Sequence, residues 1–165
     1  FENITFKQMT VTNTDENGLG IHIRNAKVEL IDVALTKSGD MALHISSSTS
    51  ETTLVATRCE FSNSEDGVYV CDSLTSATFK NCVFSDNLNK GIYGHGSTIH
   101  LRGEATAIHS NGGYGIDARY SAKVIIHLPS HHNTIYNNGN DGQFAGNDDR
   151  HAILGGTIRN QCRSR

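Results

Sequence analysis

The feature that most constrains this chain is a repeat of about 24 residues. An apolar residue followed by a short polar turn recurs at steps of 24, 26, 23, 24, 27 and 23 residues: Val11, Leu35, Phe61, Phe84, Ile108, Ile135 and Ile158. A second landmark, a glycine or alanine that opens a short strand, keeps the same period: Gly20, Ala42, Gly67, Gly91, Gly115 and Gly139. Two independent landmarks that share one period predict a stack of similar structural units.

Each unit contains short segments in which apolar and polar residues alternate, bounded by Gly, Asn and Ser. This alternation is typical of β-strands, and the absence of longer amphipathic stretches excludes helical repeats. Residues 28–35, 54–61 and 77–84 are equivalent strand segments in three successive units. In a stack, each strand pairs with its equivalent ~4.8 Å away in the next coil. We therefore predict an all-β parallel β-solenoid of six to seven coils with one continuous apolar column and little or no helix.

The length of 165 residues corresponds to one domain, residues 1–165. Residues 46–53 and 127–133 lengthen two coils and are expected to be surface loops, and residues 143–156 are predicted to form an irregular loop. Neither end shows an amphipathic cap, although solenoids normally need one. We therefore expect a fragment of a longer repeat array, or ends that contact further repeats or another subunit.

The turn and strand that follow each apolar landmark share a recognisable pattern. It runs F-S-N-S-x-D-G-V-Y-V over residues 61–70 and F-S-D-N-x-N-K-G-I-Y over residues 84–93, and it continues as I-H-S-N-G-G-Y-G-I and I-Y-N-N-G-N-D-G from residues 108 and 135. The pattern resembles the right-handed parallel β-helix repeat family of the pectate-lyase-like superfamily, from about residue 6 to 142 with a partial coil to 158. The resemblance implies the right hand of the solenoid. It implies little about function, since such repeats occur in lyases, hydrolases, epimerases, adhesins and ubiquitin-ligase subunits.

Charge and cysteine spacing exclude several classes of partner. The chain has 14 Lys and Arg against 17 Asp and Glu, a net charge of −3, which gives no electrostatic case for nucleic acid. The longest apolar runs cover three or four residues, so no membrane span is predicted. The four cysteines show no zinc spacing, and we predict neither a metal nor another cofactor. The sequence assigns no compartment and slightly favours an extracellular one.

Two sets of residues recur at equivalent positions of successive coils. Asn87, Asn111 and Asn138 align in the turn, where amide side chains can bond from coil to coil. We favour a turn-stabilising ladder over the alternative, a polar binding strip. Cys59 and Cys82 also align, and stacked strands hold Cβ atoms further apart than the ~3.8 Å that a disulfide prefers. We expect both thiols to be buried and reduced.

Three short strings are similar to polygalacturonase motifs: Asn13-Thr14-Asp15, Asp148-Asp149 and Gly94-His95-Gly96. Their order differs from that family, and Asn13 and His95 are three coils apart. Three coils span ~14 Å, more than the ~6.5–9.5 Å that separates the carboxyl groups of an inverting glycosidase. The match is attributed to chance, and the sequence does not decide whether Asp148, Asp149 or His95 has a chemical role.

One outward stripe of side chains is the candidate binding surface. In the segment from Ile21 to Arg24 the isoleucines alternate with outward residues, and equivalent segments continue both outward rows. Rings beside hydrogen-bonding groups suit a sugar or a protein partner, although Tyr and His also simply favour exposed strands. The candidate ligand-binding residues are His22, Arg24, His44, Tyr69, Tyr93, His95, Asp117 and Arg119.

These observations predict a non-catalytic binding or structural scaffold with a polysaccharide or protein partner. The alternative is a polysaccharide-active enzyme, a lyase or glycoside hydrolase, or a remnant of one. No catalytic residue is assigned.

Overall fold

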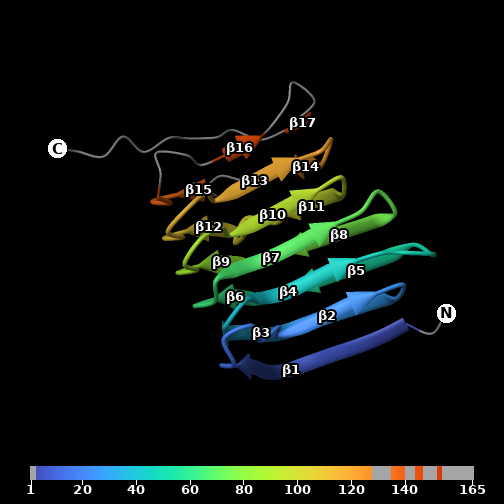
Figure 1. Ribbon diagram of the computed structural model, residues 1–165, viewed down its shortest axis with the longest axis horizontal. Helices are drawn as coiled ribbons and strands as arrows, with labels where there is room; N and C mark the ends of the chain where they lie inside the picture. Colours follow the sequence, from blue (N-terminus) through green and yellow to red (C-terminus); the bar gives the residue numbers. More distant parts are fainter. Residues whose placement is uncertain (1–2, 128–134, 140–143, 147–151, 154–165) are drawn as a thin grey trace.

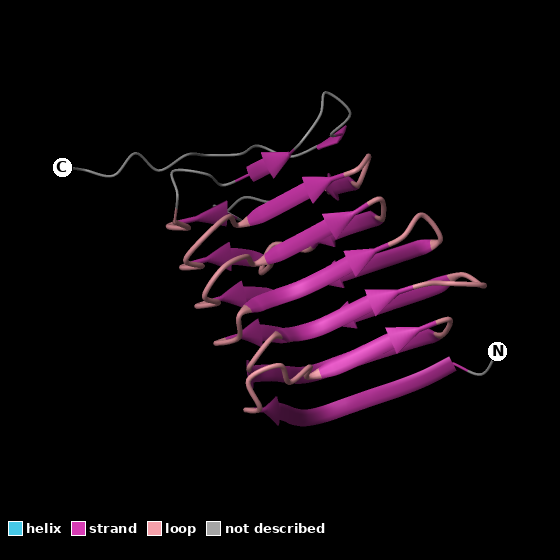
Figure 2. Ribbon diagram, in the orientation of Figure 1, coloured by secondary structure: helices cyan, strands magenta, loops and turns pink. Residues whose placement is uncertain are grey.

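The computed structural model describes residues 3–127, 135–139, 144–146 and 152–153, and these residues form a parallel β-solenoid without helix (Figures 1 and 2). The coils rise from the N-terminal strand along one axis, so that each strand lies on its equivalent in the preceding coil. About five turns with a period near 24 residues are complete. This is fewer than the six to seven predicted, because the partial coil expected up to Ile158 falls outside the described residues.

Two parallel sheets build the solenoid, and the larger one, sheet A, bends into two arms. Two long strands cross both arms, β1 (Asn3–Asn13) and β3 (Lys27–Ser38). The first arm continues with β5 (Thr52–Thr57), β8 (Thr75–Lys80), β11 (Thr98–Arg102), β14 (Lys123–Ile126) and β17 (Ala152–Ile153). The second arm continues with β6 (Glu60–Ser62), β9 (Val83–Ser85), β12 (Ala107–His109) and β15 (Ile135–Tyr136).

Sheet B closes the coil opposite sheet A. Its strands are β2 (Ile21–Arg24), β4 (Met41–Ser46), β7 (Asp66–Cys71), β10 (Ile92–His95), β13 (Ile116–Arg119) and β16 (Phe144–Gly146). A coil therefore contains up to three strands. The segments expected to be single strands over 54–61 and 77–84 are each divided by a bend.

The bends between strands rest on residues with left-handed backbone. Between the two arms these are Gln8, Asp32, Arg58, Asn81 and Gly103, with φ between 52° and 87°. Lys37, Asn63, Asp86, Ser110 and Asn137 hold the same conformation after the second arm. Asn and Asp tolerate this region, whereas Arg and Lys enter it less readily. Arg58 and Lys37 nevertheless align with the other bends. Stacking of the coils favours their left-handed conformation, because Arg58 N donates to Lys80 O in the next coil at 2.9 Å.

The core consists of inward side chains stacked in rows, as the sequence predicts. One row joins Leu35, Phe61, Phe84, Ile108 and Ile135, which pair in register and are at most 4% exposed. A second row joins Leu30, Ala56, Phe79, Leu101 and Ile126. Three phenylalanines interlock between the rows, because Phe79 meets both Phe61 and Phe84 edge-on. At about 25 cal/mol per Å², this buried apolar column is the main stabilising term of the fold.

Part of the predicted irregular loop at 143–156 is strand. Residues 144–146 pair with β13 and residues 152–153 pair with β14, both in parallel. The expectation of a loop does not hold for these five residues, because backbone pairing onto the coil below requires no apolar ladder. The loop expected at 46–53 is confirmed for residues 47–51, between β4 and β5, whereas Ser46, Thr52 and Thr53 belong to the two strands. Asn25 Oδ1 accepts bonds from the backbone N–H groups of Ser48 and Thr49 in this loop. The loop expected at 127–133 lies outside the described residues apart from His127.

Candidate functional site

The outer face of sheet B carries the two rows of side chains that the sequence singles out. Successive strands pair in register, so that His22 lies beside His44, His44 beside Tyr69, and Tyr69 beside Tyr93. We call these four residues the ring column. Next to it runs a second column, formed by Arg24, Ser46, Cys71, His95 and Arg119. The structure thus brings the predicted residues together on one face.

The rings of the column stack on one another along the solenoid axis. Their centroids are 4.5 Å apart for His22 and His44, 5.1 Å for His44 and Tyr69, and 4.7 Å for Tyr69 and Tyr93, with interplanar angles of 8° to 19°. Lys90 Nζ lies 4.6 Å from the centroid of Tyr93. The rings of His44 and Tyr69 are therefore each covered on both faces by neighbouring rings. The column can offer a ligand mainly ring edges, which carry the imidazole nitrogens and phenol hydroxyls.

Polar contacts tie the second column to the ring column. Ser46 Oγ is 3.0 Å from His22 Nε2, and Cys71 Sγ is 3.5 Å from His44 Nε2. His95 packs against Tyr120 with ring centroids 4.2 Å apart. Arg24 is exposed and forms no ion pair among the described residues. The face is thus a hydrogen-bonding surface with cationic groups near both ends.

Partial burial keeps the middle of this surface uncharged near neutral pH. Burial, followed by the nearby His22, lowers the pKa of His44. Burial is also the main cause that raises the pKa of Tyr69 to about 12 and that of Cys71 to about 11, where the Asp72 carboxylate adds to the effect. A thiol with so high a pKa is a weak nucleophile, because the thiolate is the reactive form.

Asp117 pairs with Tyr93, as the stripe predicts, but it is not exposed. Its side chain is fully buried, and Arg119 Nε donates to Oδ1 at 2.9 Å and to Oδ2 at 3.1 Å. Burial without a partner would be costly for a carboxylate, and the guanidinium of Arg119 compensates its charge. Asp117 therefore positions Arg119, and only Arg119 of this pair is accessible to a ligand.

Tyr120 and Lys90 also lie at this face, although the sequence pattern does not indicate them. Tyr120 is 58% exposed and adds a ring beside His95, whereas Lys90 covers the ring of Tyr93 and pairs with Asp66 at 3.7 Å. Tyr120 lies in a bend with φ 53°, and Lys90 precedes the strand, so neither belongs to the alternating pattern.

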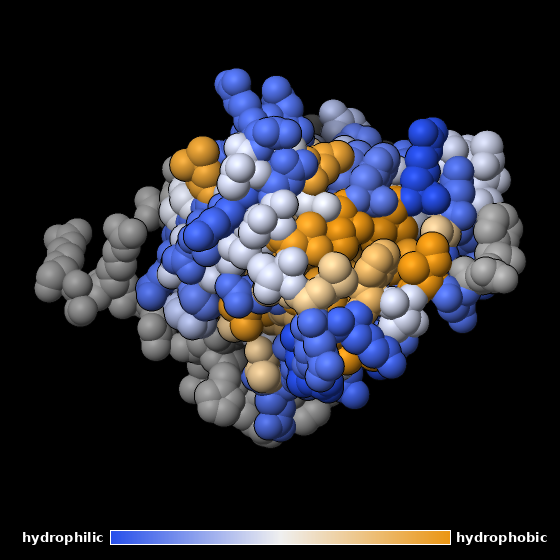
Figure 3. All heavy atoms as spheres, turned by 90° about the horizontal axis from the view of Figure 1, so that it is seen from below, coloured by the Kyte–Doolittle hydropathy of each residue, from blue (hydrophilic) through white to orange (hydrophobic). Residues whose placement is uncertain are grey.

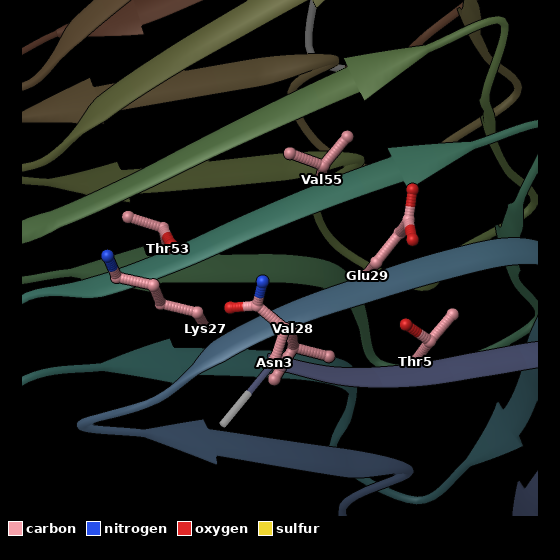
Figure 4. A pocket seen from close by; sticks show the side chains of 7 residues that line it. All are labelled: Asn3, Thr5, Lys27, Val28, Glu29, Thr53 and Val55. Carbon is pink, nitrogen blue, oxygen red and sulfur yellow. The ribbon is translucent and has the colours of Figure 1, made fainter. Parts of the chain in front are cut away.

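A hollow of about 400 Å³ lies on a different surface, the outer face of the first arm of sheet A (Figure 4). Its lining residues come from three adjacent strands: Asn3, Thr5, Lys27, Val28, Glu29, Thr53 and Val55. The side chains of Lys27 and Glu29 diverge to either side in Figure 4, and the described residues contain no ion pair between them. The alternation along β1, β3 and β5 could have indicated this hollow, because it places all of these side chains except that of the core residue Val28 outward.

The polygalacturonase-like strings are not assembled into a site. Asn13 ends β1 in sheet A, whereas His95 ends β10 in sheet B. Three further strands, β7, β4 and β2, separate β10 from the N-terminal end of sheet B. Asp148 and Asp149 lie outside the described residues. Within the described part of the chain no three His, Cys, Asp or Glu side chains are placed to hold a metal ion.

The asparagines form the predicted structural ladder. Asn87 Nδ2 donates to Asn111 Oδ1 at 2.8 Å, and Asn111 repeats the bond to Asn138. All three side chains are buried, at most 5% exposed, and each amide also donates to the carbonyl oxygen of a core residue. The ladder is inside the solenoid, so it is not a surface strip.

The predicted cysteine arrangement is confirmed for the described thiols. Cys59 and Cys82 are buried and free, and Cys59 O accepts a bond from Val83 N in the next coil. The neighbouring Cys59 thiol and burial both raise the pKa of Cys82.

The sheet order, the stacked apolar rows and the buried asparagine ladder together define a parallel β-helix protein. The chain belongs to the right-handed β-helix region family, whose model matches residues 1–161. No curated protein and no solved structure gives a significant match. No helix among the described residues is long and apolar enough to cross a membrane.

Proposed function

We propose that this β-helix is a non-catalytic binding module that contacts an extended partner through the outer face of sheet B. The observation that carries the proposal is the uninterrupted ring column beside a polar second column, over four successive coils. A repeat spacing of ~4.8 Å suits an extended partner better than a small molecule.

The orientation of the rings favours a protein over a neutral sugar. Neutral sugars pack against the faces of aromatic rings, and here the faces of His44 and Tyr69 are both occupied by neighbouring rings. A protein segment can use the ring edges, the hydroxyls and the guanidinium of Arg24 through hydrogen bonds. Tyr and Arg are also the residue types that most often dominate protein interfaces.

The experiment is a selection of displayed peptides on the immobilised chain, followed by affinity measurements on a Tyr69→Ala/Tyr93→Ala variant. We expect the selected peptides to lose at least about tenfold in affinity, or ~1.4 kcal/mol. Thr78→Ala on the outer face of sheet A is the matched control and should leave the affinity unchanged. Peptides that bind the double variant equally well would refute the role of the ring column.

A parallel assay follows product release from uronic-acid and neutral polysaccharides, with and without calcium. Turnover by the purified chain would refute the non-catalytic proposal and favour a lyase or hydrolase. Saturable binding of a polysaccharide that is abolished in the double variant would replace the protein partner with a glycan.

A further inference from the structure

Two histidines from neighbouring coils contact each other on the outer face of the first arm of sheet A. His100 belongs to β11, and His127 directly follows β14, the next strand of this arm. The strands pair in parallel, with His100 beside Ile125 and Leu101 beside Ile126. The ring of His127 reaches back along the strand, so that its Nε2 lies 2.9 Å from His100 Nδ1.

Both imidazoles are half-buried side chains on a rigid support. In the view from below in Figure 3, apolar residues gather at the centre of the end of the solenoid and hydrophilic residues surround them. His100 belongs to the outer set, because its neighbours Ile99 and Leu101 are at most 1% exposed and form part of the core. The backbone of His127 is held by a bond from its N–H to Leu101 O at 2.9 Å. The two rings are therefore positioned by strand pairing and remain accessible to solvent.

The distance between the two nitrogens matches that of two imidazole ligands on one metal ion. Metal–nitrogen bonds of ~2.0–2.1 Å that meet at an angle of roughly 90–110° place their nitrogens about 2.9–3.4 Å apart. The observed 2.9 Å corresponds to adjacent positions of an octahedral or tetragonal ion rather than of a tetrahedral one. Small rotations of the two rings about their side-chain bonds would direct both lone pairs at such an ion.

The protonation of the pair is compatible with this role, because a histidine ligand must be neutral. Burial lowers the pKa of His100, and the nearby His127 and Arg102 add to the effect. Among the described residues, neither His100 Nε2 nor His127 Nδ1 has a hydrogen-bond partner. Each ring can therefore carry its proton on that outer nitrogen, which leaves the two facing nitrogens free to act as ligands.

The other contact between histidines from neighbouring coils lacks this geometry. His22 and His44 stack face to face, with centroids 4.5 Å apart and an interplanar angle of 8°. His22 Nε2 contacts Ser46 Oγ instead of an imidazole nitrogen. Stacking of histidines along the solenoid thus does not by itself bring two ring nitrogens together.

We propose that His100 Nδ1 and His127 Nε2 together bind one divalent late transition-metal ion. No third His, Cys, Asp or Glu side chain among the described residues is placed to complete the set, so water occupies the remaining positions. The preferred angle favours Ni²⁺ and Cu²⁺ over Zn²⁺. The ion would join β11 to β14 on sheet A, and the site is independent of the proposed binding face on sheet B.

The test is calorimetric titration of the chain with Ni²⁺ at pH 7.5, since Ni²⁺ does not oxidise the free thiols as Cu²⁺ can. We expect His100→Asn and His127→Asn each to weaken the tightest site at least tenfold. His109→Asn is the matched control, because His109 is an outward histidine of β12 that stacks on Tyr136, and it should bind like the wild type. Circular dichroism verifies that each variant is folded. Wild-type affinity in either His100→Asn or His127→Asn would overturn the proposal.

The double variant His100→Asn/His127→Asn distinguishes one shared site from two separate ones. If both rings hold the same ion, either substitution already removes the chelate, so the double variant should bind about as weakly as the single variants. Losses that add up would show that each histidine binds an ion of its own, and the proposal would fail. It would fail as well if the wild-type chain bound Ni²⁺ no more tightly than the double variant.

Discussion

Asn111 donates from Nδ2 to Oδ1 of Asn138 in the next coil at 2.8 Å, and its own Oδ1 accepts from Asn87 Nδ2 at the same distance. Asn111 also forms hydrogen bonds with the backbone: its Nδ2 donates to Phe84 O, and its Oδ1 accepts from Asn87 N. One side chain thus satisfies polar groups in both neighbouring coils.

Replacing Asn111 by Ala should lower the free energy of unfolding by about 2–4 kcal/mol, since each buried polar group left unpaired costs roughly 1–3 kcal/mol. Urea denaturation followed by circular dichroism measures the change. Asn111→Ser should cost less, because Ser64 occupies the same position of the ladder and bonds to Ser38 N through its hydroxyl. Equal losses in the two variants would show that volume rather than hydrogen bonding decides.

The ring column contributes to stability as well as to the surface. Tyr69→Ala removes the ring contacts with His44 and Tyr93, and aromatic pairs are worth roughly 0.5–1.5 kcal/mol each beyond their buried area. We expect a loss of about 1–3 kcal/mol on this basis, measured by urea denaturation. Tyr69→Phe keeps the stack and should lose less. A full loss in Tyr69→Phe would assign the effect to the hydroxyl.

Accessibility, rather than pKa, predicts the order in which the three described thiols react, because the hydrogen bond with Cys82 lowers the pKa of Cys59 to about 7 but Cys59 is buried. In a Cys162→Ser background, iodoacetamide should modify Cys71 before Cys59 and Cys82, because Cys71 is half-buried and the other two are at most 3% exposed. The pKa of Cys71 is raised to about 11, so its rate should still increase between pH 8 and pH 10. Mass spectrometry of the labelled peptides gives the order. Labelling of Cys82 in the folded protein at the rate of Cys71, or a blocked thiol after denaturation without reductant, would contradict the arrangement.

Two histidines should make stability depend on pH near 6.5. Burial and His22 lower the pKa of His44, and burial, His127 and Arg102 lower that of His100. The unfolded chain therefore binds more protons than the folded one in this range, and stability should fall as the pH drops through 6.5 and level off below the folded pKa values. Urea midpoints at pH 7.5, 6.5 and 5.5 measure the slope.

His100→Asn should reduce that slope by removing one of the two groups. The raised pKa values of Asp40 and Asp66 act in the opposite direction and at lower pH, between 3.8 and their folded values. A midpoint that rises from pH 7.5 to 5.5 would contradict the assignment to the histidines.

The repeat period was sufficient to predict the strand register, because equivalent apolar residues such as Phe61 and Phe84 must stack to be buried. It also placed His22, His44 and Tyr69 on one outer face, since alternation along a strand fixes the side. It did not predict the bends at Arg58 and Asn81, which depend on the stacking of complete coils. Nor did it predict the burial of Asp117 or the occupied ring faces, which depend on side-chain conformation and on neighbours outside the repeat.

The constant register of the strands has a consequence for how the chain folds. Strand pairs join residues about one coil apart, as in the pairing of Ile92 with Val68 and with Ile116. The segment that must be closed to form each pair is therefore about 24 residues, and the entropy of closing it does not grow with the number of coils. Folding can begin at any coil with a strong core and advance to its neighbours, as in a one-dimensional array. The two adjacent coils that contain Phe61, Phe79 and Phe84, where three aromatic rings interlock, are the natural place for it to begin.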